Sequence, residues 1–411
     1  MSTSPQLIPR GSVLVTFGLV LALMAMGYGA LFAMLDDLRD AYGVNESALG
    51  AVIGIGFFAG FLAQVLIAPL ADRGHARALV LAGMAVNVAG LLLLAGARSF
   101  VPLLVGRFVM GIGVGMAVPA VRRIVILADP ARLGNNLGRL LAAEVGGFAA
   151  GPAVAAILLG PFGIPVPFIV IAGATAVALP FVVASSRRVV DDEHAPLVSQ
   201  RLAFDLLRIR PYLGALLMGC AVWVMIGSFD ALWSVALDDL DTADWIATLG
   251  ISLFALPLIV FGAVGGRLAQ RVGPFRVGAV GLLFGSAFMI IYGLVPSGVA
   301  MFVVSMVHSV NDGLTVSSTG VAAGMVVPPE RQAGAQGLLG GAQTLFAGIT
   351  ALVAGTVYET LGRTTAYLVA AALMLALVGS GWLIAGPARH LRGAPAERAA
   401  TGPAPAPAAA P

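Results

Sequence analysis

The sequence predicts an all-α membrane protein built from two similar bundles of six helices. Three observations lead to this fold class. Of the 411 residues, 59% are hydrophobic and only 10% are charged, whereas soluble domains carry roughly a quarter charged residues. Twelve apolar stretches are each long enough to cross a bilayer, which takes about 20 residues. A charged loop after the second stretch returns in part after the eighth, which indicates an internal duplication.

Short polar segments separate the apolar stretches. Their approximate ranges are 13–35, 47–70, 78–97, 101–127, 135–160, 164–185, 212–236, 244–265, 276–295, 299–326, 333–357 and 364–386. The first stretch has some features of a signal peptide, but it is long, lacks a clear cleavage site and is followed by eleven others. We therefore expect twelve membrane helices.

The longest polar stretch divides the helices six and six. We expect an N-terminal bundle over residues 1–186, a cytoplasmic linker over 187–211 and a C-terminal bundle over 212–388. The linker is expected to hold a short surface helix from Gln200 to Arg210. Residues 389–411 are rich in Pro and Ala and are expected to form a disordered cytoplasmic tail.

Alternate loops carry opposite charge. Arg73, Arg77 and Arg132 lie in one set of loops, whereas Asp37 and Asp238 lie in the other. By the positive-inside rule the Arg-rich loops face the cytoplasm, and an even number of spans places both termini there. We expect a monomeric, multi-pass protein in the lipid bilayer of the inner (plasma) membrane.

Several functional classes lack support in the sequence. No basic run or soluble domain suggests binding to nucleic acid, and no P-loop suggests direct use of ATP. The single cysteine, Cys220, lies in an apolar stretch and is interpreted as a small apolar residue. A membrane enzyme or receptor would need a nucleophile–base pair, a cluster of metal ligands or a sensing domain, and none is recognisable. We expect no enzymatic activity, cofactor or metal.

The repeated loop is the most informative motif. Residues 69–77 read PLADRGHAR, and residues 266–273 read GRLAQRVG, with Gln270 where the first loop has Asp72. Many transporters consist of two such repeats, with the substrate bound near the bilayer midplane between them.

Three motifs resemble those of the major facilitator superfamily. The first loop matches the pattern G-x-L-A-D-R-x-G-R-[KR] in part, and the fourth helix carries GRFVMGIGVG, similar to R-x-x-x-G-x-G-x-G. The fifth helix carries GFAAGP, similar to the G-x-x-x-G-P motif of antiporters. The matching residues are Leu70, Ala71, Asp72, Arg73, Arg77, Arg107, Gly111, Gly113, Gly115, Gly147, Gly151 and Pro152. The resemblance is to the twelve-helix drug:proton antiporter branch, and it implies alternating access with exchange of substrate for protons.

The charged loop is expected to act as a latch in the transport cycle. Its candidate residues are Asp72, Arg73, Gly74, Arg77 and Asp129. Asp129 ends the fourth helix, and we expect it to pair with Arg73 or Arg77 in the outward-open state only.

The glycines of the fourth and fifth helices recur four residues apart, as Gly111 with Gly115 and Gly147 with Gly151. Small residues at this spacing let membrane helices pack backbone to backbone. Pro152 removes a helix hydrogen bond, so we also expect Gly151-Pro152 to bend the fifth helix and close one side of the cavity.

Charged residues within the spans are candidates for proton coupling. An Arg at the bilayer centre costs at least about 2.5 kcal/mol and must face protein or water, so Arg107 is expected to meet another helix or the cavity. The resemblance implies a role for Arg107 in proton coupling. Arg123 and Glu144 are expected at similar depth, where a salt bridge would either hold the helices together or break during transport.

A polar stripe marks the tenth helix, where polar residues recur at steps of three and four. Its members are Ser305, His308, Asp312, Thr315 and Thr319. An acid in a membrane helix with a titratable neighbour suggests a proton relay. The alternative is a buried hydrogen bond between His308 and Asp312 that only positions the helix.

The substrate cavity is expected to be mostly apolar with few polar anchors. The candidates are Asp36, Asp230, Asn311 and Thr315. This composition favours proton-coupled export of lipophilic drugs or related small molecules. A transporter of a defined metabolite such as a sugar or amino acid is the alternative, and it would need several fixed polar groups.

Overall fold

A computed structural model describes residues 10–44, 46–186 and 200–393, and the described chain is all helical apart from its turns and loops. The N-terminal bundle consists of α1 (Arg10–Ala33), α3 (Glu46–Leu66), α4 (Ala76–Gly96), α5 (Phe100–Ala128), α6 (Leu133–Phe162) and α7 (Pro165–Ser186). The C-terminal bundle consists of α8 (Arg210–Asp238), α9 (Asp244–Val272), α10 (Pro274–Leu294), α11 (Gly298–Thr315), α12 (Ser317–Val326) and α13 (Gln332–Ala385).

The expected twelve-helix fold is confirmed. Eleven described segments are long and apolar enough to cross a membrane, and α11 with α12 forms one of them. The eleventh contains α13, whose 54 residues have non-helical backbone angles at Gly362. The non-helical angles at Gly362 mark the junction between the eleventh and twelfth helices. Its left-handed φ of 81° is one that glycine adopts readily.

Short elements connect the spans or, in the case of η6, follow the last one. They are α2 (Leu35–Tyr42), the 3₁₀ helices η1 (Ala68–Arg73), η2 (Pro130–Arg132), η4 (Phe204–Arg208), η5 (Pro329–Arg331) and η6 (Gly386–His390). The expected linker helix corresponds to the shorter η4, while α2 was not expected. The rest of the linker, residues 187–199, and the tail beyond residue 393 lie outside the described residues.

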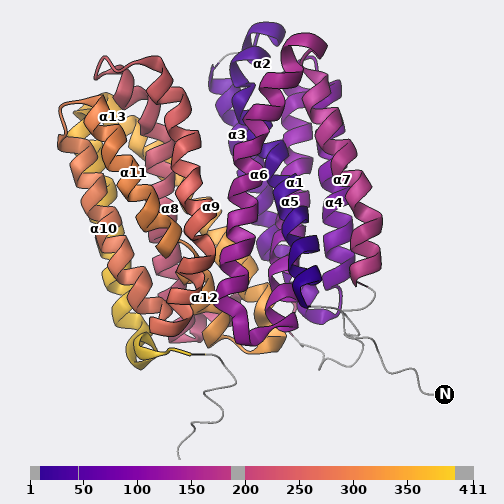
Figure 1. Ribbon diagram of the computed structural model, residues 1–411, viewed down its shortest axis with the longest axis vertical. Helices are drawn as coiled ribbons and strands as arrows, with labels where there is room; N and C mark the ends of the chain where they lie inside the picture. The colour runs from indigo at the N-terminus through magenta and orange to yellow at the C-terminus, as the bar shows by residue number, and fades with distance from the viewer. Residues whose placement is uncertain (1–9, 45, 187–199, 394–411) are drawn as a thin grey trace, which may run out of the picture.

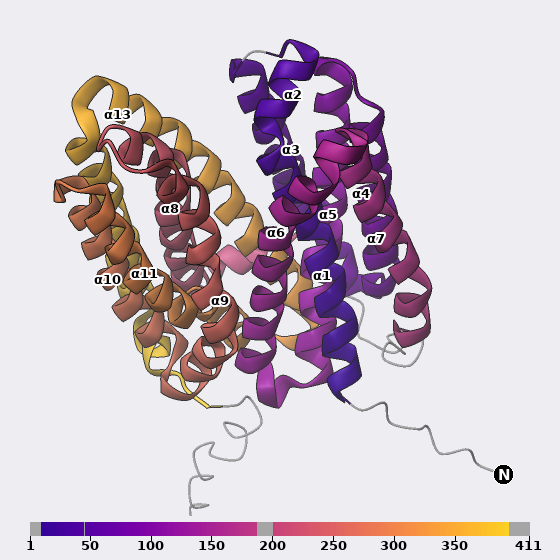
Figure 2. The same ribbon diagram turned by 45° about the horizontal axis from the view of Figure 1, so that its top comes forward.

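The two bundles meet at one end of the molecule and diverge toward the other (Figures 1 and 2). We call the end that carries η1, η2 and η5 the joined end, and the end that carries α2 and Gly362 the divergent end. The described chain begins and ends at the joined end (Figure 1), as an even number of spans requires.

Glycines form the contact between the bundles at the joined end. On one side α6 packs against α9, and a Cβ added at Gly138 or Gly266 would overlap the carbonyl oxygen of Gly262 or Gly134. On the other side α3 packs against α13, where a Cβ at Gly337 would lie 2.6 Å from the carbonyl oxygen of Gln64. The bundles therefore touch backbone to backbone.

The motif glycines pack helices together within the N-terminal bundle, as expected. Gly111 and Gly115 of α5 lie against the backbone of α3, where an added Cβ would overlap Gly56 or lie 2.6 Å from the carbonyl oxygen of Gly60. Gly147 and Gly151 of α6 lie in the same way against α1. Closure of the cavity by Gly151-Pro152 stays a prediction.

Candidate functional site

The carboxylate of Asp72 joins the two bundles at the joined end. The backbone N–H groups of Ala333 and Gly334, in the first turn of α13, donate to its two oxygens at 2.8 and 2.7 Å. Arg123 Nε of α5 donates to Oδ1 at 3.1 Å. Asp72 and Arg123 are both 2% exposed. We call these contacts the Asp72 latch.

The Asp72 latch places a negatively charged carboxylate at the N-terminus of helix α13. The first backbone N–H groups of a helix have no partner within the helix, and the helix dipole favours an anion there. Each hydrogen bond to a charged group contributes about 1.5–3 kcal/mol. Ala333 and Gly334 belong to the opposite bundle from Asp72, so the energy of these two bonds stabilises only the conformation in which the joined end is closed. The bond from Arg123 lies within the N-terminal bundle.

The expected pairing of Asp129 with Arg73 or Arg77 is not formed in this conformation, and for the outward-open state it stays a prediction. Asp129 Oδ2 lies 3.9 Å from Arg132 Nε in the next turn, and among the described residues neither Arg73 nor Arg77 forms an ion pair with it. The contact that the charged loop does make is through Asp72, which accepts hydrogen bonds from backbone N–H groups of helix α13. Gly74 ends η1 with a left-handed φ of 85° and turns the chain into α4.

The second loop makes a similar contact without the charge. Gln270 Oε1 of α9 accepts the backbone N–H of Gly134, the second residue of α6, at 2.8 Å. Its Nε2 donates to the carbonyl oxygen of Ala131 at 2.9 Å. We call these contacts the Gln270 latch, which the sequence did not indicate as functional.

The expected salt bridge between Arg123 and Glu144 is wrong by one residue. Glu144 Oε2 lies 3.4 Å from Arg122 Nη2, whereas Arg123 belongs to the Asp72 latch. Adjacent residues on a helix point about 100° apart, so the two arginines serve different partners. The side chains of Arg122 and Glu144 are 21% and 33% exposed, which leaves this pair partly open to solvent.

Arg107 is fully buried and lies among aromatic rings. Its Cζ is 3.7 Å from the centroid of the Tyr28 ring and 5.7 Å from that of Phe57. Its Nε, Nη1 and Nη2 atoms are buried and have no hydrogen-bond acceptor among the described residues. A desolvated cation–π contact contributes about 2 kcal/mol, less than the several kcal/mol that burying an ion costs. The expectation that Arg107 meets another helix is confirmed.

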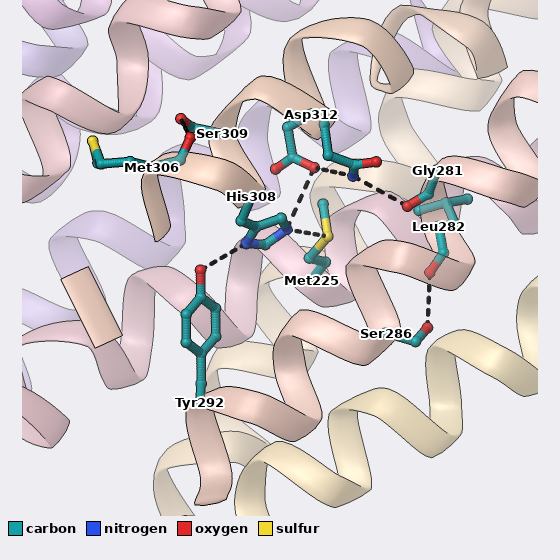
Figure 3. Close-up of polar contacts among 10 residues, drawn as sticks. Met225, Gly281, Leu282, Ser286, Tyr292, Met306, His308, Ser309 and Asp312 are labelled. Atoms are coloured by element: carbon teal, nitrogen blue, oxygen red, sulfur yellow. Dashed lines mark hydrogen bonds and ion pairs between the residues drawn. The ribbon is translucent and has the colours of Figure 1, made fainter. Parts of the chain in front are cut away.

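The polar stripe of α11 and α12 is buried in the C-terminal bundle, and Figure 3 shows the polar contacts at its centre. His308 Nε2 lies 3.4 Å from Asp312 Oδ1, and these side chains are 1% and 3% exposed. His308 Nδ1 lies 2.9 Å from the hydroxyl of Tyr292 on α10, and Nε2 lies 3.1 Å from Sδ of Met225 on α8. The expected pair of His308 and Asp312 is therefore formed.

Aromatic rings enclose His308 from three neighbouring helices. Phe288 of α10 stacks on the imidazole with ring centroids 4.8 Å apart, and Phe254 of α9 meets it edge to face at 5.6 Å. Phe229 of α8 lies at 6.4 Å. Such an apolar shell strengthens the interaction between imidazole and carboxylate.

Two of the four cavity candidates contact α10 of their own bundle. Asn311 Nδ2 donates to the carbonyl oxygen of Gly281 on α10 at 3.1 Å and to Asp312 Oδ1 at 3.3 Å. Thr315 is 4% exposed and packs on Gly281. The small residue Gly281 of α10 thus lets the face of the tenth helix that carries Asn311 and Thr315 pack inside the bundle.

The two acidic cavity candidates are exposed. Asp230 lies on the exposed surface of α8, so it stays a candidate for the cavity. Asp36 belongs to α2, where its Oδ1 lies 3.1 Å from Arg39 Nη1 and its side chain is 83% exposed. No group of His, Cys, Asp and Glu among the described residues could hold a metal ion.

Sequence reasoning missed a further ion pair beside the Asp72 latch. Arg331 of η5 binds both carboxylate oxygens of Asp205 in η4, at 2.6 and 2.7 Å. The Pro-Pro-Glu-Arg run before α13 is a helix-start signal, but it does not name the partner in the linker.

Twelve spans in two bundles, with reciprocal latches at one end and charged groups buried within each bundle, define a membrane transporter. The family model described as Major Facilitator Superfamily matches residues 17–243 and 212–410, and the chain belongs to this family. It is a multi-pass membrane protein and a transporter, as its resemblance implied.

Solved structures support the same fold. The human organic anion transporter MFSD10 (TETRAN) superposes with a TM-score of 0.73 at 18% identity, covering 91% of this chain and 100% of the other. FucP in the outward conformation gives 0.72 at 16%, covering 90% and 98%. The proton:xylose symporter XylE, bound to 6-bromo-6-deoxy-D-glucose, gives 0.74 at 12%, covering 93% and 97%.

Proposed function

We propose that this protein is a proton-coupled antiporter that exports lipophilic or amphiphilic small molecules across the inner (plasma) membrane by alternating access. The observation that carries this proposal is the buried pair of His308 and Asp312. An ionisable pair inside a membrane bundle is costly to bury and is more readily explained by proton transfer than by packing.

The pair has the parts that a proton relay needs. An imidazole changes its charge near neutral pH more readily than other side chains, and Asp312 can hold the proton or act as the counter-ion. Met225 of α8 and Tyr292 of α10 contact the same imidazole. A change in its protonation would therefore alter contacts among α8, α10 and α11, which could couple the proton to a movement of the bundle. Arg107 and Glu144 remain secondary candidates.

The two latches would control the opening and closing of the joined end during the transport cycle. We infer that the joined end faces the cytoplasm, because it carries the Arg-rich loops, so the described conformation opens outward. Export requires the joined end to separate, which breaks the contacts of Asp72 with α13 and of Gln270 with α6. The likeness to an organic anion transporter and a sugar symporter is a likeness of fold and leaves the substrate to experiment.

The test is flux in proteoliposomes with an imposed pH gradient, screened with lipophilic dyes, drugs and sugars. We expect Asp312→Asn to abolish gradient-driven accumulation while exchange without a gradient persists, because the carboxylate that carries charge is gone and the isosteric amide keeps the fold. Asp238→Asn, which removes an exposed acid at the end of α8, is the matched control. Unchanged coupling in Asp312→Asn would leave the pair with a structural role only.

A transporter of a defined metabolite remains the second candidate. It predicts gradient-dependent flux of a sugar or amino acid without flux of any drug. That result would overturn the proposal that the protein exports lipophilic compounds, but it would not change the assignment of the chain to its family.

A further inference from the structure

Arg107 carries a buried positive charge for which the N-terminal bundle supplies no anion. Its side chain is 0% exposed, and its nitrogens have no acceptor among the described residues. Within the six spans of this bundle the acidic residues are Glu46, at the start of α3, and Glu144. Glu144 is paired with Arg122. Among the described residues of this bundle, no carboxylate therefore pairs with Arg107, and an anion from outside the bundle would supply its counter-charge.

The aromatic rings that cover Arg107 come from three helices. Tyr28 and Phe32 of α1, Phe57 of α3 and Phe148 of α6 contact one another with ring centroids 5.6–6.5 Å apart. All four side chains are partly exposed, whereas the guanidinium beneath Tyr28 is buried. We call these four rings the aromatic lid.

The aromatic lid lies on the side of the bundle that faces its partner. The helices α3 and α6 contact α13 and α9 of the other bundle, and α5 also contacts α13. Those contacts are made by Gln64 on α3 and by Gly138 on α6. Phe57 and Phe148 lie about two and three turns beyond these residues, toward the divergent end. The lid is therefore placed where the bundles begin to separate.

We propose that Arg107 and the aromatic lid bind an amphiphilic organic anion, an aryl carboxylate or sulfonate. The guanidinium offers a planar fork of donors that matches a carboxylate or sulfonate. The Tyr28 ring, which now stacks on the guanidinium, turns aside and exposes it, and the remaining rings contact the apolar body of the ligand. Glycine at position 56 leaves room for the guanidinium in this position, because a Cβ there would overlap it. The proposal rests on the transport function above and names its substrate class.

The test compares two ligands of nearly equal shape, naphthalene-2-sulfonate and the neutral naphthalene-2-sulfonamide. Binding to the full chain in nanodiscs is measured by calorimetry. We expect wild type to bind the anion at least tenfold more tightly than the sulfonamide. Arg107→Gln should lose this preference, with sulfonamide affinity kept within about twofold, because a hydrogen bond to a charged group accounts for about tenfold or more. Arg107→Lys should lose part of it, because it keeps the charge without the fork.

Arg98→Gln is the control, because it removes the same charge from a loop residue that contacts Tyr42 and the end of α4. It should keep the full preference. A thermal unfolding curve for each variant separates binding from folding, and Arg107→Gln should unfold no earlier than wild type because it removes an unpaired buried charge. Equal binding of both ligands by wild type, or an anion preference that survives in Arg107→Gln, would overturn the proposal.

The flux assay separates this proposal from the one on which it rests. Gradient-driven flux of neutral or cationic dyes without any anion preference in binding would uphold proton-coupled export and refute the anion site. An anion preference that depends on Arg107, in a protein that shows no gradient-driven flux, would uphold the site and refute the coupling.

Discussion

Asp72 in the N-terminal bundle and Gln270 in the C-terminal bundle each accept a backbone N–H from the first turn of a helix in the opposite bundle. Asp72 accepts two, from Ala333 and Gly334 of α13, and also binds Arg123. Gln270 accepts one, from Gly134 of α6, and returns an N–H to the carbonyl of Ala131. The two latches are alike in position and differ in charge.

A second pair of contacts lies beside the latches, and only one of the two has a charged acceptor. Beside α13, Arg331 binds the carboxylate of Asp205. Beside α6, Arg267 Nη1 donates to the amide oxygen of Asn135 at 2.8 Å. Because hydrogen bonds to a charged group are roughly twice as strong as neutral ones, the two bonds from α13 to Asp72 hold the joined end closed more firmly than the neutral bonds between Gln270 and the α6 side. The duplicated fold thus uses the same geometry for two contacts of unequal strength.

The largest expected effect follows removal of the charged acceptor. Asp72→Ala deletes two charge-assisted hydrogen bonds between the bundles, from Ala333 and Gly334, and each contributes about 1.5–3 kcal/mol. The joined end should open on the order of 100-fold more often, because 1.4 kcal/mol is a factor of ten. The reporter is alkylation of Val65→Cys, a buried site of α3 that faces Gly341 of α13.

The reporter is placed in a Cys220→Ala background, which removes the buried native thiol. The control is Asp36→Ala, whose carboxylate lies exposed on α2 at the divergent end. An alkylation rate that stays at the wild-type value in Asp72→Ala would show that the latch does not control the joined end.

The comparison between the latches also shows what sequence patterns can predict. Apolar length predicted all twelve spans, because each must cross a bilayer of fixed thickness. Periodicity predicted that His308 and Asp312 share a face, since residues four apart on a helix are neighbours. The glycines at four-residue spacing were correctly expected to pack helices together.

The partners of these residues were harder to predict than the residues themselves. Asp72 binds backbone N–H groups, which every residue has, so no side chain at the start of α13 marked them. Counting from a turn could not decide between Arg122 and Arg123 as partner of Glu144, because boundaries are uncertain by more than one residue. Gln270 was interpreted as a lost charge, although its amide makes a similar contact. The orientation of Thr315 depended on Gly281 of a neighbouring helix.

A smaller effect is expected from the neutral latch. Gln270→Ala removes two neutral hydrogen bonds, each contributing about 1 kcal/mol, so alkylation of Val65→Cys should rise only about 30-fold. Gln270→Glu should give a slower rate than Gln270→Ala, because a carboxylate at the start of α6 favours the helix dipole. If Gln270→Ala opened the joined end as much as Asp72→Ala, charge would not be what distinguishes the two latches.

The smallest effect is expected from the pair outside the latches. Asp205→Asn converts the contact of Arg331 into an arginine–amide contact like that of Arg267 with Asn135. The side chains of Arg331 and Asp205 are 11% and 35% exposed, and partly exposed pairs contribute about 1 kcal/mol or less. Alkylation of Val65→Cys should therefore rise by about fivefold at most.

At 1 M salt, where the Debye length falls to about 3 Å, the difference between Asp205→Asn and wild type should shrink further. Asn135→Ala is the control on the α6 side and should show no comparable dependence on salt, because its contact involves one charged group only. A salt-dependent change of equal size in both variants would mean that the two sides of the joined end do not differ in their charge.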